Sequence, residues 1–395
     1  MLVPGCFSPF LASGQIDPIP RDLIQLGYNG ALEGHAPLAF YMFYFHNQPN
    51  FLSTNQTLRL AIAPTYIDTE LGIRQVIGDN TDLGIGLAGG GFADSYDEIR
   101  GGKFLPNESF VGHGGQASLS LYHCFNPDDM IPLNGVLRGL VHYSTYARDD
   151  GTADNFELPS DHSTVAIRTG LRWGGKEPIL FPSLAMELSI WYEGQYRTPT
   201  STYGFSNDRS VKQWPQLLWG QALLAYTFTN SGNSFYVNLT AGTSQNADRL
   251  SAYRLGAMLP LVSEFPLSLP GYYYQEISAR QFVMLGGNCM LPLDKQHHWS
   301  ANLVATAAVV DYLPGTEQPG NFHSGVGGGI MYSTHSLKVM VGYAYGVEAI
   351  RSSGRGANSV GILMQLDLGR ARQEFYPSEP GLWRGFQRVT GIFGH

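Results

Sequence analysis

Few residues of this chain have the types and spacing that chemistry requires. His142 lies two positions before Ser144, so an extended strand would point both side chains to the same face. A serine hydrolase needs its histidine within hydrogen-bond reach of the serine, and a third group that orients the histidine. The spacing alone supplies no third group. The sequence therefore predicts no catalytic residue, and a membrane-embedded hydrolase stays as a minor hypothesis.

Metal and nucleotide sites have equally weak support. His297 and His298 follow Asp294 in a predicted turn, but a zinc site would need further ligands from elsewhere in the chain. The glycine runs at 89–91 and 325–329 do not open a helix after a strand, as a phosphate-binding loop does. Glycine also suits tight turns and crowded strand positions. No metal site and no cofactor are predicted.

The dominant pattern is an alternation of apolar and polar side chains over about ten residues at a time. No apolar run is long enough for a membrane helix. In the clearest stretch, one face would carry Leu184, Met186, Leu188, Ile190 and Tyr192, and the other Glu187, Ser189, Trp191, Glu193, Gln195 and Arg197. One face suits lipid and the other, apart from Trp191, suits water. The pattern predicts an all-β fold, a transmembrane antiparallel β-barrel.

The composition agrees with a surface that faces lipid. Charged residues make up 14% of the 395 residues, against about 25% in soluble domains. The net charge of −8 argues against nucleic acid as a partner, because phosphate binding needs clustered lysine and arginine. The 22 tyrosines and 21 phenylalanines suit strands and the girdles at membrane interfaces. The predicted location is the bacterial outer membrane, with its lipids as partners.

Three regions are predicted along the chain. Residues 1–30 contain several prolines without sustained periodicity and are interpreted as an irregular arm. Residues 31–369 form the barrel of about 14 to 16 strands, the count depending on a further strand near 22–34 and on whether the segment 57–76 splits. The last alternating strand is expected to pair with the first. Residues 370–395 form a tail, either a short amphipathic segment or a frayed polar end.

Charged side chains are expected to face the lumen. Arg168, Arg172, Glu187 and Glu193 all fall on faces opposite the apolar stripes. Buried charge is tolerated only where it is solvated or paired. The mixed signs predict either a hydrated, weakly selective pore or a network of ion pairs that cross-links the lumen. The sequence pattern shows no large single-sign array of the kind that gives strong ion selectivity.

Residues 253–315 carry a further pattern. The segment reads YRLGAMLPLVSEFPLSLPGYYYQEISARQFVMLGGNCMLPLD, and the strand after it ends in AAVVDYLPG. This part of the chain resembles the end of the barrel in the outer-membrane assembly factor superfamily. That superfamily includes the BamA and TamA insertases, the bacterial surface antigens and the two-partner-secretion transporters.

The resemblance implies a long loop whose tip folds into the lumen and meets an aspartate of a following strand. Leu269, Pro270, Gly271 and Tyr272 would form the tip, and the aspartate would be Asp311. Pro270 stands where the superfamily has an arginine, so the usual contact cannot form. Arg254 or Arg280 would then supply the cation for Asp311 within the lumen.

The composition of residues 257–272 leads to the same expectation. Three prolines restrict the backbone and lower the entropy of ordering the segment. Its leucines and Phe265 are too apolar for a freely exposed loop. The segment is therefore predicted to fold into the lumen. The alternative is an extracellular loop whose apolar residues bind a protein partner.

Three functions remain open from the sequence. The resemblance implies a translocation or assembly barrel, acting alone or within a complex of envelope proteins. Superfamily members carry periplasmic domains ahead of the barrel, and none is expected in this chain, which counts against an insertase. The other two hypotheses are a passive porin for small polar solutes and a plugged scaffold barrel. An enzyme is not predicted.

Overall fold

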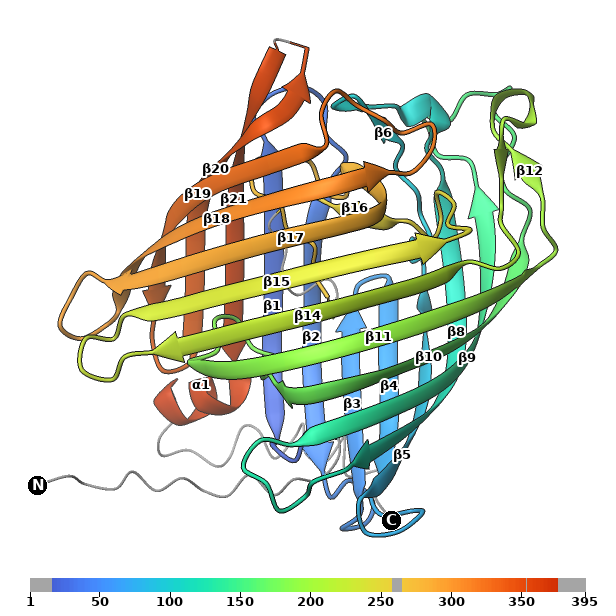
Figure 1. The fold of residues 1–395 in the computed structure, drawn as a ribbon. Coiled ribbons are helices and arrows are strands. Elements are labelled where there is room, and N and C mark those ends of the chain that lie inside the picture. The colour runs from blue at the N-terminus through green and yellow to red at the C-terminus, as the bar shows by residue number, and fades with distance from the viewer. Residues whose placement is uncertain (1–15, 258–264, 353, 376–395) are drawn as a thin grey trace, which may run out of the picture.

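The computed structural model describes residues 16–257, 265–352 and 354–375. Sixteen antiparallel strands follow one another around a closed barrel (Figure 1). They are β1 (Arg21–Ala31), β2 (Ala39–Pro49), β3 (Gln56–Ala63), β4 (Tyr66–Ile73), β5 (Thr81–Gly90), β8 (Val111–Cys124), β9 (Leu133–Ala147), β10 (His162–Gly175), β11 (Leu184–Thr198), β14 (Gln216–Thr227), β15 (Ser234–Gln245), β17 (Ile277–Pro292), β18 (Trp299–Tyr312), β19 (Phe322–Ser333), β20 (Leu337–Arg351) and β21 (Gly354–Asp367). The predicted fold class is confirmed.

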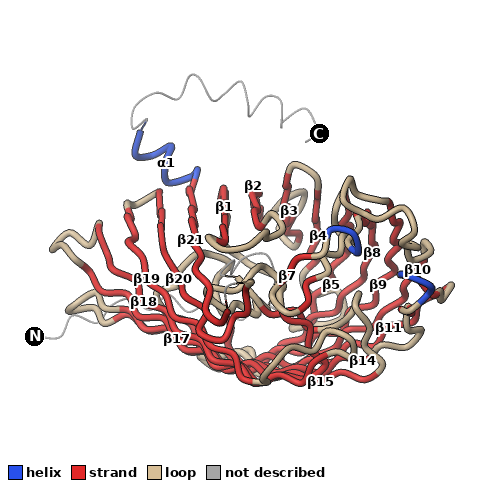
Figure 2. Tube along the Cα trace, turned by 90° about the horizontal axis from the view of Figure 1, so that it is seen from above, coloured by secondary structure: helices blue, strands red, loops and turns tan. Residues whose placement is uncertain are grey.

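Short elements decorate the connections between these strands. They are β6 (Ile99–Arg100), β7 (Lys103–Phe104), η1 (Pro106–Glu108), β12 (Thr202–Tyr203), η2 (Phe205–Asn207), β13 (Arg209–Ser210), β16 (Tyr253–Leu255) and α1 (Leu368–Phe375). Figure 2 looks onto the ring of strands and shows loop segments inside it. In the part of the chain that the structure describes, no helix has the length and apolar character needed to cross a membrane.

The last strand closes the barrel against the first, as the sequence predicts. The β1–β21 register runs from Leu23 opposite Asp367 to Ala31 opposite Ser359. Closure pairs the backbone groups that an open sheet edge would leave exposed to hydrocarbon.

The two faces of the strands divide as the alternation predicts. On β11, Leu188 and Ile190 are 56% and 52% exposed, whereas Glu187 is only 4% exposed. On β10, Leu171 faces outward while Arg172 lies on the inner face, within ion-pair distance of Glu187. The outer face is therefore an apolar surface of the kind that lipid covers.

Two predicted boundaries need correction. The barrel begins with β1 at residue 21 and not at residue 31, so the strand considered near 22–34 exists. Its inward face carries the apolar Leu23 beside Gln25, and this mixture hides the alternation. The segment 57–76 splits into β3 and β4 at Pro64, which gives sixteen strands. In the predicted tail, α1 is helical, and residues 376–395 lie outside the described residues.

The two ends of the barrel differ in the length of their connections. The long connections 91–110, 148–161, 199–215 and 246–276 share one end, which we call the loop end. The opposite turn end carries short connections such as 334–336, together with α1. In Figure 1, β6 and β12 lie at the top and α1 near the bottom. Outer-membrane barrels have long extracellular loops and short periplasmic turns, and the connections of this barrel show the same asymmetry.

Candidate functional site

The described part of the connection between β15 and β17, residues 246–257 and 265–276, enters the barrel, and we call it the lumen loop. Residues 258–264 of the predicted segment 257–272 lie outside the described residues. Its tip rests on the inner wall at Gly325 of β19 and Gly346 of β20, which are opposite each other in the strand register. A Cβ on Gly325 would lie 2.1 Å from the carbonyl oxygen of Pro270. A Cβ on Gly271, whose φ is +85°, would lie 1.9 Å from the Gly346 nitrogen. Only glycines allow this close backbone approach.

Aromatic and histidine side chains hold the tip in place. Leu269 and Tyr272 are fully buried within an apolar cluster that includes inward residues of β17 and β18. The Tyr272 hydroxyl lies 3.2 Å from His323 Nδ1, and the Tyr312 hydroxyl lies 2.6 Å from His323 Nε2. One imidazole of the wall therefore bridges the tip and the neighbouring strand. The four residues predicted as the tip lie in the lumen together.

The base of the lumen loop is fastened by a buried ion pair. Arg351 Nη1 and Nη2 donate to the two carboxylate oxygens of Glu276 at 2.9 and 3.0 Å, and both side chains are 1% exposed. The Tyr273 ring stacks 3.6 Å from the Arg351 guanidinium, and its hydroxyl donates to the Glu33 carbonyl at 2.9 Å. Glu33 in turn accepts the backbone N–H of Asn358 on β21. The loop base thus joins β20 to the β1–β21 seam.

The prediction that Asp311 contacts the tip inside the lumen is wrong. Val310 and Tyr312 are buried in the lumen cluster, so Asp311 between them points outward. Arg280 does pair with Asp311, with Nε 2.7 Å from Oδ2, but the two side chains are 51% and 46% exposed. A register shift at Arg280 in β17 turns its side chain to the outer face. Of the two predicted cations, Arg280 is the partner of Asp311. The pair lies on the outer face of the barrel, however, and not in the lumen.

Arg254 does not reach Asp311 either. Its guanidinium donates to the carbonyl oxygens of Gln275 and Asp97, and it stacks 4.7 Å from the centre of the Tyr96 ring. It therefore ties β16 to the connection between β5 and β8.

Phe265 of the lumen loop contacts a different part of the inner wall, on β11 and β14. The ring of Phe265 lies 5.5 Å from that of Trp191 on β11 and 5.6 Å from that of Trp219 on β14. Arg172 lies 5.0 Å from the Trp191 ring, and Arg168 lies 5.6 Å from the Trp219 ring. Trp191, the exception on the polar face in the sequence, is therefore a contact for the loop.

The predicted lumen charges are cross-linked. Arg168 Nη2 lies 2.6 Å from Glu193 Oε2, and Arg172 Nε lies 3.5 Å from Glu187 Oε1. Each cation has an acidic partner on the adjacent strand. Of the two arrangements that the sequence left open, the structure favours the ion-pair network over the weakly selective pore.

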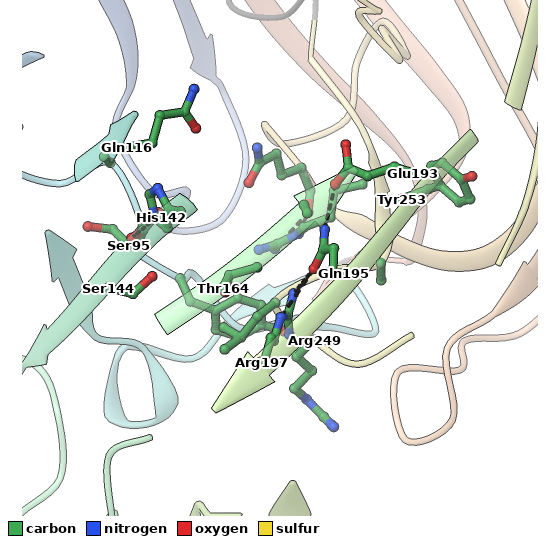
Figure 3. Close-up of a pocket in the computed structure, with 18 of the residues that line it drawn as sticks. Ser95, Gln116, His142, Ser144, Thr164, Glu193, Gln195, Arg197, Arg249 and Tyr253 are labelled. Atoms are coloured by element: carbon green, nitrogen blue, oxygen red, sulfur yellow. Dashed lines mark hydrogen bonds and ion pairs between the residues drawn. The ribbon is translucent and has the colours of Figure 1, made fainter. Parts of the chain in front are cut away.

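A polar chamber of about 540 Å³ remains between the lumen loop and the inner faces of β8 to β11 (Figure 3). Residues that line it include Gln116, His142, Ser144, Thr164, Gln195 and Tyr253. His142 Nε2 lies 2.7 Å from Asp94 Oδ2. Burial alone would raise the pKa of Asp94, but the hydrogen bonds from His142 and Ser144 lower it below its ordinary value. Ser144 is hydrogen-bonded to the Asp94 carboxylate. The three side chains therefore do not follow the Asp–His–Ser order that nucleophilic catalysis uses.

The connections at the loop end form a dome over the lumen, which the sequence did not predict. Glu98 is fully buried and accepts hydrogen bonds from Tyr96 at 2.8 Å, Arg249 at 3.0 Å and Arg209 at 3.3 Å. Arg209 also bonds to Glu108. Burial lowers the pKa of Arg249, but the charge of Glu98, its hydrogen bond and the nearby Tyr96 and Tyr203 together raise it overall. These ion pairs join the connections 91–110, 199–215 and 246–276 into one unit.

The seat of the tip gives a direct prediction. We expect Gly325→Ala to weaken docking of the lumen loop, because the added methyl group meets the Pro270 carbonyl. Overpacking of this kind costs about 1–3 kcal/mol, which shifts a docking equilibrium about 5- to 150-fold. Single-channel recordings in planar bilayers should show more frequent openings. Gly361→Ala is the matched control, because its nearest neighbour is 3.6 Å away. Equal opening frequencies in the two variants would contradict this docking site.

No protein-family model and no curated protein sequence matches this chain. Solved structures do match. CdiB from Acinetobacter baumannii aligns with a TM-score of 0.58 at 11% identity, over 88% of this chain and 60% of that chain. CdiB from Escherichia coli aligns with a TM-score of 0.56 at 11% identity, over 89% and 64%. BamA from Haemophilus ducreyi, lacking POTRA domains 1–3, aligns with a TM-score of 0.54 at 11% identity, over 88% and 70%.

The chain therefore has the fold of the BamA and CdiB barrels, and the predicted resemblance is confirmed at the level of the fold. It spans 60% of the CdiB chain from Acinetobacter baumannii. The fold is one of bacterial outer-membrane barrels.

Proposed function

We propose that this chain is an outer-membrane barrel that handles polypeptides, in translocation or in assembly. The observation that carries the proposal is the lumen loop, whose tip is seated on the glycine pair Gly325 and Gly346. A seat with this fit holds the loop in one position, and release requires breaking the contacts of Tyr272 with His323 and of the tip with the buried cluster. The loop then serves as a gate that a polypeptide displaces.

The loops that pack inside the lumen support a gated barrel over a passive one. The dome ties three long connections together, and one of them, the lumen loop, packs against the inner wall of the barrel. A passive porin needs a continuous aqueous path at all times, whereas a translocation barrel needs one only while its client passes. The outer-membrane location, the lipid contact of the outer face and a role for envelope proteins as partners belong to this proposal, and we infer no enzymatic activity.

Site-specific photo-crosslinking in cells tests the proposal. A photoreactive residue in place of Thr164, which lines the chamber, should crosslink to polypeptides in transit. The same residue in place of Ile167, which is 54% exposed on the outer face of the same strand, is the control and should not. Steady conductance of small ions without any crosslinked polypeptide at Thr164 would favour a passive channel, for which the chamber of about 540 Å³ would be part of the path.

A further inference from the structure

The turn between β10 and β11, residues 176–183, leaves its own wall and crosses the lumen. In the pairing order of the sixteen strands, β10 and β11 are opposite β1 and β21. Even so, Arg21 at the start of β1 bonds to Glu177 at 3.2 Å, and Gln25 Nε2 donates to the Pro178 carbonyl at 3.5 Å. In Figure 1 this turn is the green loop drawn beside β1. We call it the crossing turn.

Side chains of the far wall bind the crossing turn mainly through the backbone groups of the turn. Gln365 Oε1 accepts the N–H of Leu180 at 2.8 Å, and Gln25 Nε2 donates to the same oxygen at 2.9 Å. Lys338 Nζ donates to the carbonyl oxygens of Leu180 at 2.9 Å and Phe181 at 3.4 Å. Every peptide has these N–H and C=O groups. Three wall side chains therefore recognise a main chain and not a particular sequence.

One apolar side chain supplies the selectivity. Leu180 is 2% exposed and belongs to a buried cluster with Met331, Met340 and Leu363, which all point inward. Phe181 packs against the same cluster. Methionine side chains adapt to differently shaped apolar groups. The combination of main-chain hydrogen bonds and an adaptable apolar pocket is the chemistry of a peptide-binding site.

The crossing turn is an imperfect occupant of this site. Phe181 has a φ of +54°, a left-handed conformation that is costly for a bulky residue. The turn reaches the site because it is tethered to β10 and β11, and tethering raises its effective concentration to about the millimolar range. A peptide without this strained residue could make the same contacts, provided that its local concentration is high.

We propose that the site formed by Gln25, Lys338, Gln365 and the Met331, Met340 and Leu363 cluster binds an extended apolar segment of a client polypeptide. The crossing turn occupies the site in the resting barrel and blocks the turn end of the lumen. An arriving client segment with a leucine-like side chain displaces it. The biological role as a client site rests on the proposed function, but binding of a peptide by this wall does not.

A labelled peptide with the sequence of residues 176–183, KEPILFPS, is the probe. In one barrel variant a Gly-Ser segment of equal length replaces residues 177–182, which empties the site. Fluorescence anisotropy in detergent should show saturable binding of the peptide to this variant. The parent should bind at least about tenfold more weakly, because its own turn competes intramolecularly. The same peptide with aspartate in place of leucine should not bind to either barrel.

A second set of variants identifies the wall. In the turn-replaced barrel, Lys338→Met or Gln365→Leu should abolish peptide binding, while Ile167→Val on the outer face of β10 should leave it unchanged. If the turn-replaced barrel does not fold, Leu180→Ser in the full-length turn takes its place. A folded variant with an emptied site that leaves the peptide unbound would overturn the proposal, as would binding that ignores Lys338 and Gln365. Peptide binding without crosslinking at Thr164 would support the peptide-binding site but contradict the proposed role in translocation.

Discussion

Replacing Arg351 by methionine is expected to cost about 3–5 kcal/mol of unfolding free energy, because it leaves the Glu276 carboxylate buried without its partner. Both side chains of the pair are 1% exposed, so water cannot take over the lost hydrogen bonds. The variant also loses the stacking of Tyr273 on the guanidinium. Urea unfolding followed by tryptophan fluorescence measures the difference, with the parent and the variant fitted with the same dependence of the unfolding free energy on urea concentration.

The chain offers its own control for this prediction. The pair Arg280 and Asp311 has a single contact and lies exposed on the outer face, at the loop end of β17 and β18, and exposed pairs contribute about 0–1 kcal/mol. Arg280→Met should therefore have little effect. The double variant Glu276→Gln with Arg351→Met should recover much of the loss, because it removes the unpaired charge. An equal cost for Arg351→Met and Arg280→Met would refute the buried anchor of the lumen loop.

Local patterns predicted the parts of the fold that depend on neighbours in sequence. The two faces of β11 follow from the alternation, because successive side chains of a strand point to opposite faces, here toward lipid or toward the lumen. Trp191 broke that pattern, and the structure explains it by contact with Phe265, which is distant in the chain. The start of β1 was missed because Leu23 packs inside the barrel and gives both faces apolar residues.

The lumen contacts could be predicted only in part. The tip at Pro270 and Gly271 follows from the resemblance and from the composition, while the position of Arg280 on the outer face, beside Asp311, depends on a register shift that no local pattern reveals. The dome and the crossing turn depend on pairs far apart in sequence, such as Lys338 with Leu180, at a separation of 158 residues. Polar residues in irregular connections carry no periodicity, so their partners become visible only once the barrel brings them together.

Placing an arginine at Leu188 is expected to destabilise the barrel by about 2–4 kcal/mol in a lipid bilayer, the usual cost of this residue at a midplane position that faces lipid. Leu188 is 56% exposed near the middle of β11, where the outer face would contact hydrocarbon. The proposed outer-membrane location depends on this face, so the variant tests more than one strand. Equilibrium unfolding from lipid vesicles measures the difference.

Leu52→Arg is the matched control, because Leu52 is 66% exposed in the turn between β2 and β3, outside the membrane-spanning strands. It should change the unfolding free energy by no more than about 0.5 kcal/mol. On the inner face, Glu187→Leu should also destabilise, since it strips Arg172 of an acidic partner within the lumen. Should Leu188→Arg fold as well as the parent while Glu187→Leu is impaired, the outer face would not meet hydrocarbon, and the case for a membrane barrel would fail with it.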